Sequence, residues 1–68
     1  MYCMEIGEKL RLLRVKKNFT QDYIAFCLEI SQPAYHKIEN GKTNINLKQL
    51  EELAAIYEIT VVDILGNE

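Results

Sequence analysis

The sequence predicts an all-α domain built from five short helices, and three observations lead to this prediction. Apolar residues recur at helical spacing, hydroxyl or amide residues stand where helices would begin, and no stretch alternates in the manner of a strand. With 68 residues, of which 49% are hydrophobic, the chain suits one domain with one core. We therefore expect a single domain over residues 1–68, with its compact part at about residues 6–65.

The first helix is predicted from Ile6, because Ile6, Leu10 and Leu13 follow the i, i+4, i+7 spacing of an amphipathic helix. Residues 1–5 are expected to be loosely held. Asn18 should end this helix in a left-handed conformation, since Asn tolerates it better than most residues. Phe19 should then pack inward.

The next two helices are predicted at about residues 21–28 and 32–40. Thr20 and Ser31 precede them and can accept hydrogen bonds from their free N–H groups. Pro33 falls in the first turn of the second one, where a missing N–H has no cost. Because so few residues separate the two helices, we expect them to cross at a steep angle.

Two capping boxes predict the last two helices. Asn46 with Gln49 begins one of them, and Thr60 with Asp63 begins a short final helix over Val61–Leu65. The inward stripe of the longer helix should consist of Leu47, Leu50, Leu53, Ala54 and Tyr57.

The charge of the chain is unevenly distributed. The formal net charge is −2, with eight basic and ten acidic residues. All of the basic residues lie in residues 1–48, whereas the charged residues of 49–68 are all acidic. The first part can therefore present a basic face to one partner while acids stay elsewhere.

Composition argues against several other classes of protein. Cys3 and Cys27 are too few for a disulfide scaffold or zinc site, and we expect free thiols in a reducing cytoplasm. No apolar run approaches the roughly 20 residues of a membrane helix, and the N-terminus does not resemble a signal peptide. His36 is the single histidine, so it cannot form a catalytic pair by itself. The sequence also has no glycine-rich phosphate loop. We expect neither an enzyme nor a bound metal or cofactor.

Several short motifs occur together in a characteristic order. They are Leu10-x-x-Leu13-Arg14, Thr20-Gln21, Ala25, Ile30-Ser31-Gln32, Ile38-Glu39-Asn40-Gly41-Lys42 and Leu50-x-x-Leu53-Ala54. In this combination the chain resembles the helix-turn-helix family of phage repressor and Cro proteins, often called XRE-like. The resemblance implies a five-helix, repressor-like DNA-binding domain, with the helix-turn-helix at the second and third helices. It also implies a homodimeric transcriptional regulator, expected to repress, that binds palindromic double-stranded DNA.

The third helix would then enter the major groove, where side chains near a helix N-terminus reach base edges. The polar face of this helix supplies the expected base contacts, Gln32, Pro33, His36 and Lys37. Helix ends and the loop after the third helix supply the expected phosphate contacts, Gln21, Asn40, Lys42, Thr43, Arg14 and Lys17.

The resemblance also implies structural roles. Arg14 and Glu39 should form a partly buried ion pair, with Arg14 also able to touch a phosphate. Glu29 stands where the family usually has Gly, so the turn is either rearranged or strained by about 1 kcal/mol. The apolar residues near the C-terminus should form the dimer interface, namely Ile59, Val61, Val62, Ile64 and Leu65.

A second interpretation of function stays open at this point. The same fold can serve as an antitoxin or adaptor that binds a protein, such as a toxin or another regulator. The acidic residues Glu51, Glu52 and Glu58 of the fourth helix would then contact the partner. The dependence of DNA affinity on salt separates the two interpretations, because phosphate contacts release counterions.

Overall fold

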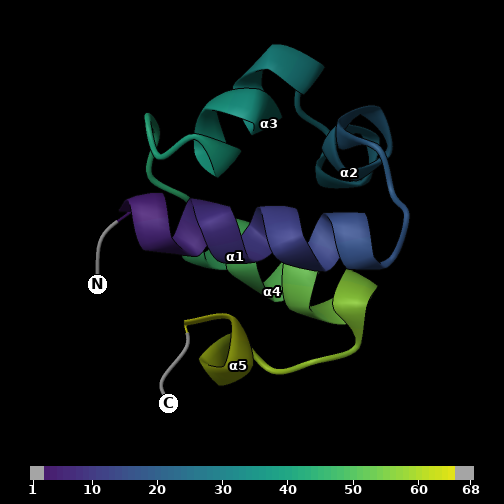
Figure 1. The fold of residues 1–68 in the computed structure, drawn as a ribbon, viewed down its shortest axis with the longest axis vertical. Coiled ribbons are helices and arrows are strands. Elements are labelled where there is room, and N and C mark those ends of the chain that lie inside the picture. Colours follow the sequence, from purple (N-terminus) through teal and green to yellow (C-terminus); the bar gives the residue numbers. More distant parts are fainter. Residues whose placement is uncertain (1–2, 66–68) are drawn as a thin grey trace.

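The computed structural model describes residues 3–65, and these form five α-helices with no strand among them. The helices are α1 (Cys3–Lys16), α2 (Gln21–Leu28), α3 (Gln32–Glu39), α4 (Leu47–Tyr57) and α5 (Val61–Leu65). Figure 1 shows α1 crossing the middle of the molecule, with α2 and α3 on one side and α4 and α5 on the other. The predicted all-α fold is thus confirmed.

Local capping explains where most of the helices begin. The side chains of Thr20, Ser31 and Asn46 accept hydrogen bonds from backbone N–H groups in the first turns of α2, α3 and α4. Both predicted capping boxes are present, including that of Thr60 and Asp63, whose reciprocal bonds measure 3.1 and 3.0 Å. These boundaries could be located without tertiary information because each cap needs only residues three positions apart.

Two predicted boundaries need correction. Helix α1 begins at Cys3, so the expectation that residues 3–5 lie outside it was wrong. No Pro or N-cap residue stands just before Ile6, so the helix extends toward the N-terminus beyond Ile6, the first residue of its apolar stripe. Residues 1–2 lie outside the described part. The helix predicted at about residues 32–40 ends one residue earlier, because α3 stops at Glu39 and Asn40 is its C-cap.

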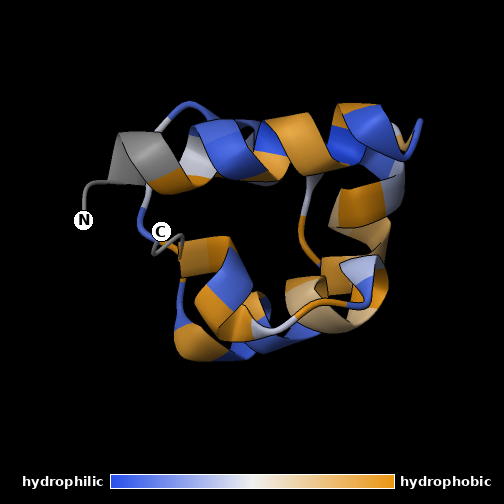
Figure 2. Cartoon of the chain, turned by 60° about the horizontal axis from the view of Figure 1, so that its bottom comes forward, coloured by the Kyte–Doolittle hydropathy of each residue, from blue (hydrophilic) through white to orange (hydrophobic). Residues whose placement is uncertain are grey.

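The core is formed by side chains from every helix. The buried hydrophobic residues are Leu10, Ile24, Ala25, Leu28, Tyr35, Ile38, Leu50, Leu53, Ala54, Tyr57 and Ile64. Figure 2 shows hydrophobic segments on each helix, including most of α5. The prediction for Leu47 was wrong, because its side chain is 63% exposed. It lies at the edge of the apolar stripe, in the first turn of α4.

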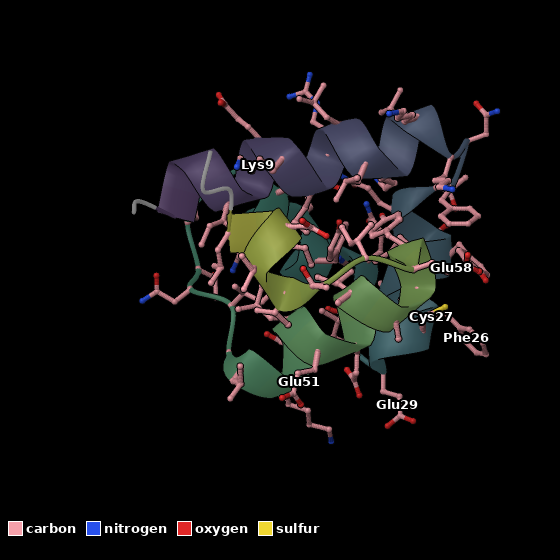
Figure 3. All side chains as sticks on the ribbon, turned by 90° about the horizontal axis from the view of Figure 1, so that it is seen from below. Lys9, Phe26, Cys27, Glu29, Glu51 and Glu58 are labelled. Atoms are coloured by element: carbon pink, nitrogen blue, oxygen red, sulfur yellow. The ribbon has the colours of Figure 1, made fainter. Side chains whose placement is uncertain are left out.

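Surface charges follow the division that the sequence showed. Glu51 and Glu58 belong to α4 and its C-cap, and Figure 3 shows both side chains pointing outward. Phe26 also points outward and is 79% exposed. These two acids are therefore not in the core, and the exposed residues of α3 itself, Gln32, Pro33, His36 and Lys37, include no acid.

Helix α1 approaches α3 closely at Gly7. This glycine is buried, and a Cβ atom placed on it would clash with the Glu39 carbonyl oxygen and lie 2.7 Å from that of Ile38. Both atoms belong to the backbone at the end of α3, so no side-chain rotation can relieve the contact. Gly7 therefore sets how closely α1 and α3 pack.

Within residues 3–65, three residues other than glycine have positive φ angles. Asn18, Glu29 and Glu58 have φ values of 63°, 61° and 59°, each directly after or near a helix end. The expectation for Asn18 is confirmed. Glu29 keeps the left-handed geometry that favours Gly, and Ile30 N donates to Ala25 O at 3.0 Å, as in a normal helix stop. The turn is therefore strained rather than rearranged.

Substituting Gly7→Ala should lower the free energy of unfolding by about 1–3 kcal/mol, because the methyl group has no room. Helix propensity alone predicts the opposite sign, a gain of about 1 kcal/mol. Urea unfolding followed by circular dichroism measures the difference. The neighbouring exposed substitution Glu8→Ala should change stability by less than about 0.5 kcal/mol. A more stable Gly7→Ala protein would contradict the close approach.

Substituting Glu29→Gly should raise the free energy of unfolding by about 1 kcal/mol, because it relieves the left-handed strain. The melting temperature should rise by about 4–8 °C for a domain of this size. Glu51→Gly is the matched control. It lies on the exposed face of α4, where Gly should cost about 1 kcal/mol. Equal loss of stability in both variants would show that Glu29 is not strained.

Candidate nucleic-acid interface

Helix α3 has two faces with different environments. Tyr35, Ile38 and Glu39 are buried against the rest of the domain. The opposite face is exposed. Together with the residues just after α3 it lines a shallow hollow, formed by Gln32, Pro33, His36, Lys37, Asn40 and Lys42. The structure thus brings the four residues predicted to contact bases onto one outward surface.

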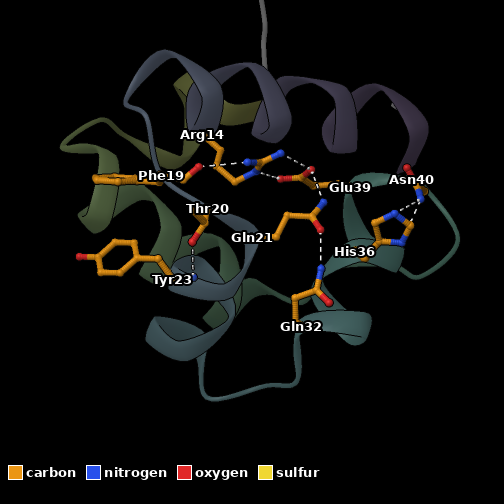
Figure 4. A network of polar contacts seen from close by, with 9 residues as sticks. All are labelled: Arg14, Phe19, Thr20, Gln21, Tyr23, Gln32, His36, Glu39 and Asn40. Atoms are coloured by element: carbon orange, nitrogen blue, oxygen red, sulfur yellow. Dashed lines mark hydrogen bonds and ion pairs between the residues drawn. The ribbon is translucent and has the colours of Figure 1, made fainter.

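The ion pair of Arg14 and Glu39 anchors the buried face. Arg14 Nε donates to Glu39 Oε2 at 2.7 Å and Arg14 Nη2 to Oε1 at 3.3 Å, while Nη1 donates to the Phe19 carbonyl at 3.0 Å (Figure 4). The pair that the resemblance implied is therefore present. The two side chains are only 15% and 1% exposed. These bonds use three of the five N–H donors of Arg14, and its assignment as a phosphate contact stays a prediction.

The surroundings of Glu39 keep its carboxyl group ionised. Burial alone would raise the pKa of Glu39, but hydrogen bonds from Arg14 and Gln21 outweigh it and lower the pKa below its usual 4.5. Burial also raises the pKa of the Tyr35 hydroxyl, and the adjacent Glu39 carboxylate raises it further. Burial likewise raises the pKa of Tyr57 to about 12. The site therefore contains one buried negative charge, balanced by Arg14.

Gln21 connects this ion pair to the exposed face. Its Nε2 donates to Glu39 Oε1 at 3.0 Å, and its Oε1 accepts from Gln32 Nε2 at 2.6 Å (Figure 4). The sequence interpretation assigned Gln21 to a phosphate and missed these contacts. Gln21 and Gln32 are each the first residue of their helix, and that shared position was the only available signal.

A second polar contact lies on the last turn of α3. The Asn40 side-chain nitrogen is 3.3 Å from His36 Nδ1 and 3.2 Å from Nε2. Their i, i+4 spacing makes this contact possible within one helix. It restricts both side chains, each of which was predicted to face DNA.

The remaining predicted phosphate contacts lie at the margins of α3. Lys42 and Thr43 are exposed in the loop that follows α3, and Lys17 is exposed just after α1. Figure 1 shows the end of α1 beside α2, whereas the loop after α3 lies near the start of α1. These residues therefore stand at opposite ends of the surface formed by α2 and α3.

The predicted dimer residues divide into two groups. Val62 and Leu65 are 61% and 36% exposed, whereas Ile59 and Val61 pack partly against the core. Ile64 is 1% exposed and belongs to the core of its own chain, so its assignment to an interface was wrong. Helix α5 packs against α4 and α1, and Ile64 is the buried residue of this helix.

Comparison with known proteins agrees with this geometry. The sequence profile of a helix-turn-helix family matches residues 10–64, which is most of the chain. The chain belongs to this family. This helix-turn-helix protein is 32% identical to the control protein C.MunI of a Mycoplasma species, over 94% of this chain and 88% of that one.

Other relatives and a solved structure extend the comparison. The transcriptional activator BcrR of Enterococcus faecalis is 37% identical over 96% of this helix-turn-helix chain. The chain spans 32% of BcrR, about a third of its length. The crystal structure of the restriction-modification controller protein C.AhdI from Aeromonas hydrophila superposes with a TM-score of 0.83, at 26% identity, covering 91% of this chain and 94% of that one. The relatives named here include transcription regulators.

Two further properties can be stated for residues 3–65. None of the helices in this range is both long and apolar enough to cross a membrane. Within the same range, no three His, Cys, Asp or Glu side chains are grouped so that they could hold a metal ion. Cys27 is half-buried and free.

The ionised state of Glu39 should make folding sensitive to acid. Because its pKa in the folded protein lies below the unfolded value, it adds stability above about pH 4.5 that is lost as the pH falls through the folded pKa. Glu39→Gln should therefore be less stable at pH 7 and lose less stability than the wild type between pH 7 and pH 3. Urea unfolding at both pH values measures this, and Glu58→Gln, at an exposed site, should follow the wild type. Equal losses for Glu39→Gln and wild type would contradict the ion-pair assignment.

Proposed function

We propose that this protein is a sequence-specific regulator of transcription that binds double-stranded DNA with α3 in the major groove. The observation that carries the proposal is the two-faced character of α3. One face is buried against the core, and the other face carries the exposed residues Gln32, Pro33, His36 and Lys37. A major groove about 12 Å wide accepts one such helix. Membership of the helix-turn-helix family supports the same conclusion.

The exposed side chains have distinct capacities for reading bases. The Gln32 amide can pair with adenine N6 and N7, and the Lys37 ammonium can donate to guanine O6 or N7. Pro33 offers apolar contact to a thymine methyl group. His36, held by Asn40, lies one turn further along the same face.

Contacts to the DNA backbone would come from the margins of this surface. Lys42, Thr43 and Asn40 follow α3, and Lys17 follows α1. The first N–H groups of α2, at Gln21, point from a helix N-terminus that attracts phosphate. These contacts position the helix without reading sequence.

The protein would act as a homodimer on a palindromic operator, with repression as its effect. Val62 and Leu65 are the exposed apolar residues of α5, and the partly buried Ile59 and Val61 lie beside them in the chain. A dimer through this end would place two α3 helices roughly 34 Å apart, one DNA turn.

Selection of bound sequences from random double-stranded DNA tests this proposal. The expected result is a palindromic motif whose preferred bases change in Lys37→Ala, together with affinity that falls steeply as salt rises. Lys9→Ala is the control, because Lys9 lies in a groove between α1 and α5, away from α3. Sedimentation should show two chains per operator.

Two other results would contradict the proposed function in whole or in part. Recovery of no motif, with an affinity that does not depend on salt, would overturn the proposal. That result would favour the protein-binding alternative through the acidic residues of α4, Glu51, Glu52 and Glu58. A single chain per operator would overturn the dimer alone.

A further inference from the structure

A groove lies between α1 and α5, on the side of the molecule away from α3. Figure 1 shows α5 below α1, whereas α3 lies above it. The groove has a volume of about 390 Å³, and its floor includes Leu12, Leu13 and Ile59. Leu12 is 69% exposed, and the other two side chains are half-buried. The groove therefore leaves apolar surface in water, and covering that surface would be favourable.

Two lysines border this apolar floor. Lys9 and Lys16 are seven residues apart on α1, which is about two helical turns. Their side chains therefore leave the helix in nearly the same direction, about 10 Å apart along its axis. Figure 3, which views the molecule from the α5 side, shows Lys9 beside α5. Among the residues that the structure describes, neither ammonium group forms an ion pair.

The acids near the groove do not cancel this positive charge. Asp63 also lines the groove, but its carboxylate accepts a hydrogen bond from the Thr60 N–H at 3.1 Å and caps the start of α5. A neighbouring hollow on α1 contains Glu8 and Arg11, whose charges offset each other. The groove and its border thus keep a positive charge, carried by the two lysines.

The groove is distinct from the surface of α5 proposed for dimerisation. Successive residues of a helix are about 100° apart, so Asp63 and Leu65 point about 160° away from each other. Asp63 lines the groove, whereas Leu65 and Val62 belong to the exposed apolar surface proposed for the dimer. One chain can therefore hold a partner in the groove and a second copy of itself on the other flank of α5.

We propose that this groove binds an amphipathic α-helix of a partner protein, whose acidic residues pair with Lys9 and Lys16 while its apolar residues cover the floor between them. Charge complementarity selects this occupant. Acids seven residues apart on a helix that lies alongside α1 have the same spacing as the two lysines. A nucleic-acid backbone would match the lysines but would leave Leu12 and Ile59 in water. The inference goes beyond the proposed function, because the groove lies away from α3 and leaves the DNA-binding surface free.

Two synthetic helical peptides that differ only in charge test the inference. Each is about 20 residues long and rich in alanine, because shorter helices are marginal in water. Each carries a stripe of leucines bordered by two charged residues seven positions apart, which are Glu in the acidic peptide and Lys in the basic one. Fluorescence anisotropy measures the affinity of each peptide for the full chain, and amide chemical shifts from NMR locate the binding site.

The acidic peptide should bind about tenfold more tightly than the basic one, as expected for two exposed ion pairs compared with two repulsive pairs. This ratio should shrink at about 1 M salt, which screens exposed charges. The amide shifts should lie along the groove, at Leu12 and Ile59. These measurements need only the wild-type chain, so they do not depend on whether any variant folds.

Charge-reversing substitutions add a second, independent comparison. Lys16→Glu should abolish the preference for the acidic peptide, and Lys9→Glu combined with Lys16→Glu should reverse it. Lys48→Glu is the matched control, because it makes the same change of charge at an exposed lysine of α4 outside the groove. It should leave the ratio of the two affinities close to the wild-type value. Circular dichroism and urea unfolding confirm that each variant is folded.

Three results would overturn this inference without touching the proposed function, because no step of the test uses DNA. Equal affinity for the two peptides, or no binding of either, would show that the lysines recruit no acidic helix. Amide shifts confined to Val62 and Leu65, or to α4, would place the peptide on another surface. Dissociation of a homodimer by Lys16→Glu, measured by sedimentation, would assign the groove to a second copy of this chain.

Discussion

The ion pair of Arg14 and Glu39 is the interaction on which the arrangement of the other helices depends. Arg14 belongs to α1, Glu39 is the last residue of α3, and a third contact of Arg14 reaches the Phe19 carbonyl before α2. Three segments thus converge on one guanidinium. Removing one partner of such a buried pair typically costs about 3–5 kcal/mol, because the other charge stays unpaired. For a small domain that is a large part of its total stability.

The short helices need this support. Helix α3 has eight residues, too few to be stable by itself in water. Its position comes instead from Tyr35 and Ile38 in the core, from the ion pair at its end, and from the close approach of α1 at Gly7. A surface that reads bases must be held within a fraction of an ångström, and rigid helices packed in this way provide such a support.

Much of this structure could be predicted from local sequence. The caps at Thr20, Ser31 and Asn46 were predicted because a cap requires only neighbouring residues. The left-handed Asn18 was predicted for the same reason. The errors at Leu47 and Ile64 concern side chains at the edge of a stripe or in a very short helix. There, periodicity cannot decide which face another helix will cover.

Spacing and residue type were enough to predict that five helices form, where four of them begin, and which side chains of α3 are exposed. Only the tertiary structure showed that Gln21 bridges Glu39 and Gln32. It alone showed that Gly7 fits against the end of α3, and that Arg14 bonds to both Glu39 and the Phe19 carbonyl. These contacts join residues from different helices, so their geometry depends on how the helices pack, which no local pattern records.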